Sequence, residues 1–172
     1  MMINKEETAK ELSEALSGLL KAVELFDEIQ YHKIPFENSW TAGQVVAHLS
    51  LSNNGFLEVL NAKVADTARA IDELKPQLKA IFLNFGNKMK SPDFILPKLK
   101  AYDQETQRSE IGKTKEAFLK AINDLDLSKT CVSFPLPGLG NLTRLEAIYF
   151  VIYHTERHTN QLKEIYRFLK EA

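Results

Sequence analysis

The chain has 172 residues, of which 44% are hydrophobic and 26% are charged, so it can bury a hydrophobic core and is not expected to be disordered. Its 22 basic and 23 acidic side chains nearly cancel, which argues against a nucleic acid partner because no excess of positive charge is available to bind phosphates. The single cysteine, Cys131, excludes an internal disulfide and any metal site built from several cysteines.

The N-terminal segment becomes acidic at Glu6 and Glu7 and lacks the apolar stretch of a signal peptide. The longest apolar run, residues 147–153, is far shorter than the ~20 residues that span a membrane. These features predict a cytoplasmic protein with no membrane segment, and the length predicts a single domain over residues 1–172.

A first helix is predicted from Asn4 to about Ile29, with Asn4 as its N-cap. Apolar residues recur along it every three or four positions, as in a helix that packs one face against a core; they are Ala9, Leu12, Leu16, Leu19, Val23 and Phe26. The next segment, residues 30–39, is predicted to be a connection, and its His32 is expected to be exposed.

A second helix is predicted from Thr41 to about Ala62, because Thr41 and Gln44 have the spacing of a capping box. Residues 65–102 contain several prolines and predict a long crossover. Within it, a short helix is expected from Pro76 to about Gly86.

A third long helix is predicted over residues 104–124, followed by an extended or turn segment over residues 130–141. The fourth helix begins at Thr143, which forms a second capping-box pattern with Glu146, and continues to about Lys170. Four long helices in a chain with only seven glycines and six prolines predict an all-α four-helix bundle. Because the crossover between the second and third helices is long, these two helices can be parallel.

Polar residues interrupt one apolar stripe of the fourth helix. The stripe begins and ends with apolar residues, but its centre holds His154, His158 and Gln161. Residues four apart share a helix face, so both imidazoles can present a nitrogen to one ion. Burying them without partners would cost about 1–3 kcal/mol per group, so a metal or hydrogen-bond partners are required.

His48 is the candidate third ligand, because it lies on an apolar stripe of the second helix with Val45, Ser52 and Phe56. Three histidines with one open position are typical of catalytic zinc sites. The alternative is that these histidines are core or surface residues without a metal. Thr155 follows His154, so the His-Glu-x-x-His motif of zinc proteases is absent.

Other reactive or aromatic side chains have simpler interpretations. Cys131 is predicted to be a small buried hydrophobe rather than a nucleophile. Trp40 and Phe56 are expected in the core rather than as platforms for a ligand. Glu156 and Arg157 are expected on a solvated helix face, from which Arg157 could reach an anionic substrate.

Two sequence blocks resemble the DinB-like superfamily. They are residues 40–49 (WTAGQVVAHL) and residues 149–162 (YFVIYHTERHTNQL), and the entry segment 139–143 (LGNLT) is also similar. The resemblance implies a four-helix bundle with up-down-down-up topology and a metal-binding triad of His48, His154 and His158. Gln161 lies where similar proteins often carry a polar residue and is not assigned as a ligand. Similar proteins are often homodimers, and Leu19, Leu20 and Phe150 are expected to supply apolar surface for one.

The triad predicts a divalent transition metal, with Zn or Ni first and Fe, Cu or Mn as alternatives. One hypothesis is a metal-dependent enzyme, either a hydrolase or an S-transferase for a low-molecular-weight thiol, acting on a small-molecule substrate. Such a thiol would be a cosubstrate, since Cys131 lies outside the triad motifs. The second hypothesis is a non-catalytic, stress-related bundle that binds a metal or small molecule, because no acid–base pair is recognisable. A purely structural protein is the third.

Overall fold

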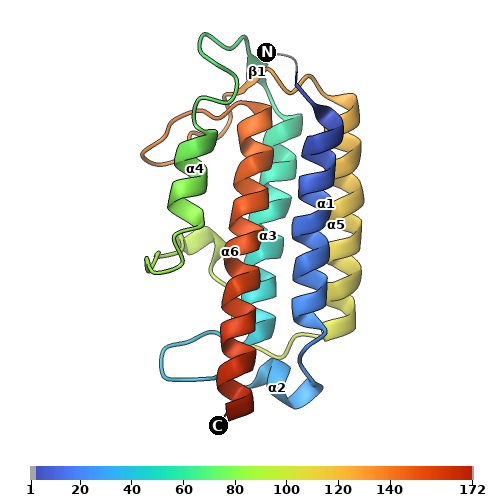
Figure 1. The fold of residues 1–172 in the computed structure, drawn as a ribbon, viewed down its shortest axis with the longest axis vertical. Coiled ribbons are helices and arrows are strands. Elements are labelled where there is room, and N and C mark those ends of the chain that lie inside the picture. The colour runs from blue at the N-terminus through green and yellow to red at the C-terminus, as the bar shows by residue number, and fades with distance from the viewer. Residues whose placement is uncertain (1–2, 172) are drawn as a thin grey trace.

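The computed structural model describes residues 3–171, which form four long helices that lie side by side (Figure 1). The chain order is α1 (Lys5–Val23), α2 (Glu28–His32), α3 (Ala42–Asn61), β1 (Val64–Ala65), α4 (Lys75–Phe82), the 3₁₀ turn η1 (Asp93–Ile95), α5 (Gln104–Asp124), β2 (Thr130–Cys131) and α6 (Arg144–Glu171). Helices α1, α3, α5 and α6 make the bundle, so the predicted all-α four-helix bundle is confirmed.

The directions of the helices follow from contacts between their ends. The side chain of Lys5 at the start of α1 donates to the carbonyl of Leu125 just after α5, so these helices are antiparallel. Gln107 near the start of α5 donates to the carbonyl of Gly43 near the start of α3, so those two are parallel. In Figure 1, α1 and α6 run down the page while α3 and α5 run up. The crossover between α3 and α5 returns the chain along the bundle.

The first helix is shorter than its apolar pattern predicts. It ends at Val23, and the chain turns before the separate short helix α2. Asp27 causes the new start, because its side chain accepts from the backbone N–H of Gln30 in a complete capping box. Phe26 in the turn is nevertheless buried and packs on Tyr166, so the apolar pattern continues after the helix has ended.

The predicted helix starts are confirmed. The side chain of Asn4 accepts from the N–H of Glu7, and Thr41 forms a capping box with Gln44. Thr143 and Glu146 exchange the same pair of bonds at the start of α6. In the crossover, α4 ends at Phe82 rather than near Gly86. The segment over residues 130–141 is extended at β2, which pairs with β1, and turns at two glycines with positive φ.

The bundle helices share one hydrophobic core. This core includes Leu19 and Phe150, which were expected to supply apolar surface. Leu19 is 1% exposed and Phe150 is 7% exposed, and both belong to this core, while Leu20 packs partly buried against it. They therefore cannot supply the apolar surface expected for a dimer, and a homodimer stays a prediction that needs another surface.

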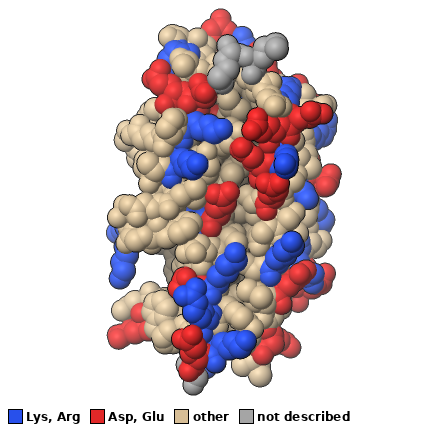
Figure 2. All heavy atoms as spheres, viewed as in Figure 1, with Lys and Arg blue, Asp and Glu red and all other residues tan. Residues whose placement is uncertain are grey.

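Figure 2 shows acidic and basic side chains interspersed on the face it presents. Between residues 3 and 171, no helix combines the length and the apolar character needed to cross a membrane.

A buried ion pair fixes the first part of the crossover to α6. The carboxylate of Glu146 is fully buried and accepts two bonds from the guanidinium of Arg69, at 2.6 and 2.7 Å. It also accepts from the backbone N–H groups of Leu74 and Thr143, at 2.7 and 2.8 Å. One side chain thus caps α6 and holds the segment that leads into α4.

We expect Glu146→Ala to lower the free energy of unfolding by about 3 kcal/mol, because it leaves a partly buried guanidinium and two backbone donors without their acceptor. Denaturant titration followed by circular dichroism measures this. Glu164→Ala is the matched control, since Glu164 pairs with Arg167 on the exposed surface and should cost less than about 0.5 kcal/mol. Equal losses for the two variants would contradict the anchoring role of Glu146.

Candidate metal centre

The three predicted histidines meet in the core between α3 and α6. His48 comes from α3, and His154 and His158 come from successive turns of α6. The Nε2 atom of His154 lies 3.2 Å from Nε2 of His48 and 3.0 Å from Nε2 of His158. The exposed fractions of His48, His154 and His158 are 1%, 6% and 8%, so all three residues are at least nine-tenths buried. The antiparallel packing of the two helices thus brings together residues that are about a hundred positions apart in sequence.

Each imidazole is oriented by a second contact at its Nδ1 atom. Nδ1 of His48 lies 3.0 Å from the carbonyl oxygen of Ile95 in η1, and Nδ1 of His158 lies 2.6 Å from Oε1 of Gln161. Nδ1 of His154 lies 3.3 Å from the hydroxyl of Ser52. A carbonyl and an amide oxygen only accept, so in His48 and His158 the proton is assigned to Nδ1 and the lone pair to Nε2.

Burial keeps the three imidazoles neutral. Loss of hydration lowers the pKa of His48 and, far more, that of His154, whose two histidine neighbours lower it further. Burial lowers the pKa of His158 to about 3. Neutral imidazole is the form that ligates metals, so these rings have the right protonation state near neutral pH.

The donor set fits a transition-metal ion. With metal–nitrogen distances of 2.0–2.1 Å, two ligands of a tetrahedral site lie about 3.3 Å apart, close to the 3.0 and 3.2 Å between the Nε2 atoms. Converging lone pairs repel each other unless a cation or a shared proton lies between them. Among residues 3–171, no other group of histidine, cysteine or carboxylate side chains meets the geometry for a metal ion.

Aromatic side chains pack against the histidines. The ring centroid of Trp40 lies 5.1 Å from that of His48, and the ring centroids of Phe82 and Phe150 lie 5.4 and 5.3 Å from that of His154. Phe56 is buried and stacks on Phe150 at 4.2 Å, as expected of a core residue. Trp40 is only half buried, and its contact with His48 makes it part of the wall of the site.

His32 and Cys131 lie outside the histidine cluster. The expectation that His32 is exposed is wrong, because its ring is half buried between the carbonyl oxygens of Glu28 and Tyr102, each at 2.8 Å. It therefore joins α2 to the segment before α5. Cys131 is fully buried, and burial raises the pKa of its thiol to about 11, which agrees with the predicted role as a small hydrophobe.

Arg157 has a different role from the one expected. Its guanidinium donates to the carbonyls of Phe82, Asn84 and Asn87, so it holds the segment after α4 against α6. It is therefore engaged by the chain rather than free to bind an anionic substrate. The sequence pattern signals such roles poorly, since the acceptors are backbone groups some 70 residues away.

The whole-chain comparisons agree with this architecture. The profile of the DinB superfamily matches residues 11–162. The chain belongs to the DinB superfamily.

Two Bacillus subtilis proteins are similar to this DinB-superfamily member. The uncharacterized protein YuaE of strain 168 is 25% identical over 138 residues, which cover 80% of this chain and 84% of YuaE. The solved structure of YfiT superposes with a TM-score of 0.64 at 17% identity, covering 99% of this chain and 91% of that one. YfiT is described as a probable metal-dependent hydrolase with an unusual four-helix bundle topology. At this identity, the likeness to YfiT shows the fold alone.

We expect Cys131 to resist alkylation in the native protein. With a pKa of about 11, about one thiol in a thousand is ionised at pH 8, and the side chain is 0% exposed. Iodoacetamide at pH 8, followed by mass spectrometry, should label the folded protein at least tenfold more slowly than the protein unfolded in guanidinium. Equal labelling rates would contradict the buried position of the thiol.

Proposed function

We propose that this DinB-superfamily protein binds one divalent transition-metal ion through Nε2 of His48, His154 and His158 and uses it to hydrolyse a small-molecule substrate. The observation that carries the proposal is the convergence of three neutral imidazoles whose Nδ1 atoms already have partners. Three protein ligands leave a coordination position for water or substrate, which is the arrangement of catalytic rather than structural zinc sites.

When bound, such a metal lowers the pKa of a coordinated water or thiol toward neutrality and so supplies a nucleophile. The chain's own residues have supporting roles. Gln161, Ser52 and the carbonyl of Ile95 orient the three rings, and the surrounding aromatic side chains exclude bulk water. We rank hydrolysis first because the fold neighbour YfiT is described as a probable metal-dependent hydrolase.

Transfer to a low-molecular-weight thiol is the second catalytic candidate. The buried, protonated Cys131 cannot serve as the nucleophile, so the thiol would be a cosubstrate that enters from outside. The same site would then activate a thiol in place of water.

A non-catalytic, metal-binding bundle is the alternative. It is favoured by the composition of the cluster, since no carboxylate or further histidine in the described part of the chain joins the three rings. A general acid or base would then have to come from the substrate or from solvent. Three imidazoles suit Zn or Ni first, and Fe, Cu or Mn are the remaining candidates for the ion.

Elemental analysis tests metal binding. Protein purified without an affinity tag or chelator should contain about one transition-metal ion per chain, and His154→Ala should lose it because two imidazoles rarely suffice. His32→Asn is the matched control, since His32 lies outside the cluster, and it should keep the ion. A stoichiometric ion that persists in His154→Ala, or a parent protein that binds none of the candidate metals, would overturn the site.

Turnover assays separate the proposed activities. The metal-loaded protein should hydrolyse members of an ester and amide panel without thiol, whereas a transferase would require glutathione or bacillithiol. A fully loaded protein without turnover in either panel would favour the non-catalytic alternative.

Gln161→Leu should weaken metal affinity about 10–100-fold, because an unsupported imidazole loses orientation and basicity. At limiting metal the turnover of this variant should fall, and excess metal should restore it.

A further inference from the structure

The ligand atoms of the histidine cluster are closed off from solvent. The contacts that join Nε2 of His154 to Nε2 of His48 and to Nε2 of His158 are buried. A metal ion or a substrate can reach these atoms only when part of the surrounding wall moves. The part of the wall that is held most weakly is therefore the expected entrance.

Residues 84–101, which we call the strap, cross the site from one helix to the other. The strap follows α4, and its first part is held against α6, where Arg157 donates to two of its carbonyl groups (Figure 1). Farther along it reaches α3, where the carbonyl oxygen of Ile95 lies 3.0 Å from Nδ1 of His48. Arg157 directly precedes His158 in α6, so both attachments lie at the level of the histidines.

Both ends of the strap are anchored in the bundle. Before it, Phe82 is buried, and its ring packs against that of His154. After it, the carbonyl oxygen of Tyr102 lies 2.8 Å from Nε2 of His32. Tyr102 also packs closely on α3, because a Cβ atom added at Gly43 would lie only 3.1 Å from Cβ of Tyr102. These two ends are fixed points between which the strap can move.

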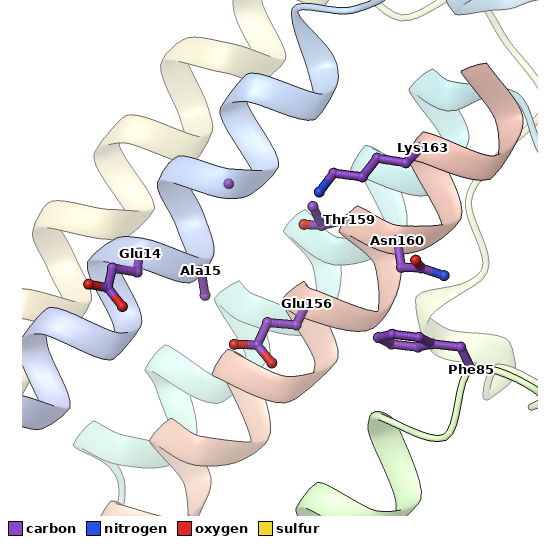
Figure 3. A pocket seen from close by; sticks show the side chains of 8 residues that line it. Glu14, Ala15, Phe85, Glu156, Thr159, Asn160 and Lys163 are labelled. Atoms are coloured by element: carbon purple, nitrogen blue, oxygen red, sulfur yellow. The ribbon is translucent and has the colours of Figure 1, made fainter. Parts of the chain in front are cut away.

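The middle of the strap is packed loosely. None of its residues is buried, and Phe94 is 67% exposed. Phe85 lines a surface hollow beside Asn160 of α6 and does not enter the core (Figure 3). Among the described residues, the backbone–backbone hydrogen bonds of the strap join only residues three apart within it. A segment with few buried contacts and only local hydrogen bonds opens at a low cost in free energy.

Two side chains from the bundle helices hold the strap by hydrogen bonds. Within residues 3–171 they are Arg157, which bonds two strap carbonyls, and His48, which bonds one. Arg157 also donates to the carbonyl of Phe82 at the fixed end. A charged guanidinium forms stronger hydrogen bonds than a neutral donor, so Arg157 is the main attachment.

We propose that the strap is a lid over the metal centre and that Arg157 is its latch. Opening breaks the contacts at Arg157 and Ile95, moves residues 84–101 away from the contact between α3 and α6, and uncovers the histidines to a metal ion and a small-molecule substrate. Closing returns the Ile95 carbonyl to His48 and so restores the orientation of that ring. This role of the strap rests on the proposed function, because the lid serves a site that binds an ion.

Chemical modification of the histidines measures access to them in metal-free protein. Diethyl pyrocarbonate acylates accessible neutral imidazoles, and peptide mass spectrometry gives the rate at each position. Arg157→Gln should react at the three clustered histidines about tenfold faster than the parent, because the strap has lost its charged attachment. Arg167→Gln is the matched control and should react at the parent rate, since Arg167 pairs with Glu164 on the exposed surface of α6.

Cys131 distinguishes opening of the strap from loss of the whole fold. Its thiol is buried and lies outside the strap, so iodoacetamide should alkylate it at the same rate in Arg157→Gln as in the parent. Faster histidine modification with unchanged alkylation of Cys131 supports the lid. Equal histidine rates in the variant and the parent, or a parallel rise at Cys131, would overturn it.

Release of a bound ion gives a second readout. Protein loaded with Zn²⁺ should lose the ion to a chelator about tenfold faster in Arg157→Gln than in the parent, for the same reason. Equal release rates would overturn the role of the strap as the entrance. A parent chain that binds no ion would end the metal proposal, whereas the modification rates of metal-free protein would still decide whether the strap covers the histidines.

Discussion

The antiparallel contact between α3 and α6 is the constraint on which the rest of the site depends. It buries three imidazoles at one level of the bundle, with Nε2 atoms 3.0 and 3.2 Å apart. Burial makes protonation of the rings unfavourable. Each neutral ring therefore has only one N–H group and lacks the second one that a charged ring could donate to its neighbours. The lone pairs assigned to Nε2 of His48 and His158 both face Nε2 of His154, and a cation is a partner that would satisfy all three nitrogens at once. This physical requirement is the basis of the proposed metal centre.

The crossover belongs to this arrangement although little of it is regular structure. Glu146 holds its first part through Arg69, and Arg157 holds the segment after α4 through three carbonyl groups. Farther along, the carbonyl of Ile95 orients His48. Both anchoring side chains come from α6, which also carries two of the histidines. Displacement of the crossover at Ile95 would therefore remove the acceptor that orients His48.

Local features of the chain were predictable because they depend on nearby residues. Capping boxes form between residues three apart, so the starts at Thr41 and Thr143 could be read directly. The pair His154 and His158 shares a helix face through the helical repeat alone. His48 was identified by its place on an apolar stripe, which predicts a core position. The end of α1 was missed because Phe26 continues the apolar pattern after Asp27 has started a new helix.

By itself, the sequence determined the four bundle helices, most of their ends and which histidines face the core, since these follow from short-range hydrogen bonding and from helical periodicity. Only the tertiary structure decided that the three Nε2 atoms converge, that Ile95 supports His48, and that Arg157 is engaged by backbone carbonyls. It also decided that Phe150 is buried in the bundle core. These properties depend on how helices distant in sequence pack together, and a periodic pattern gives a residue's face but not its neighbour.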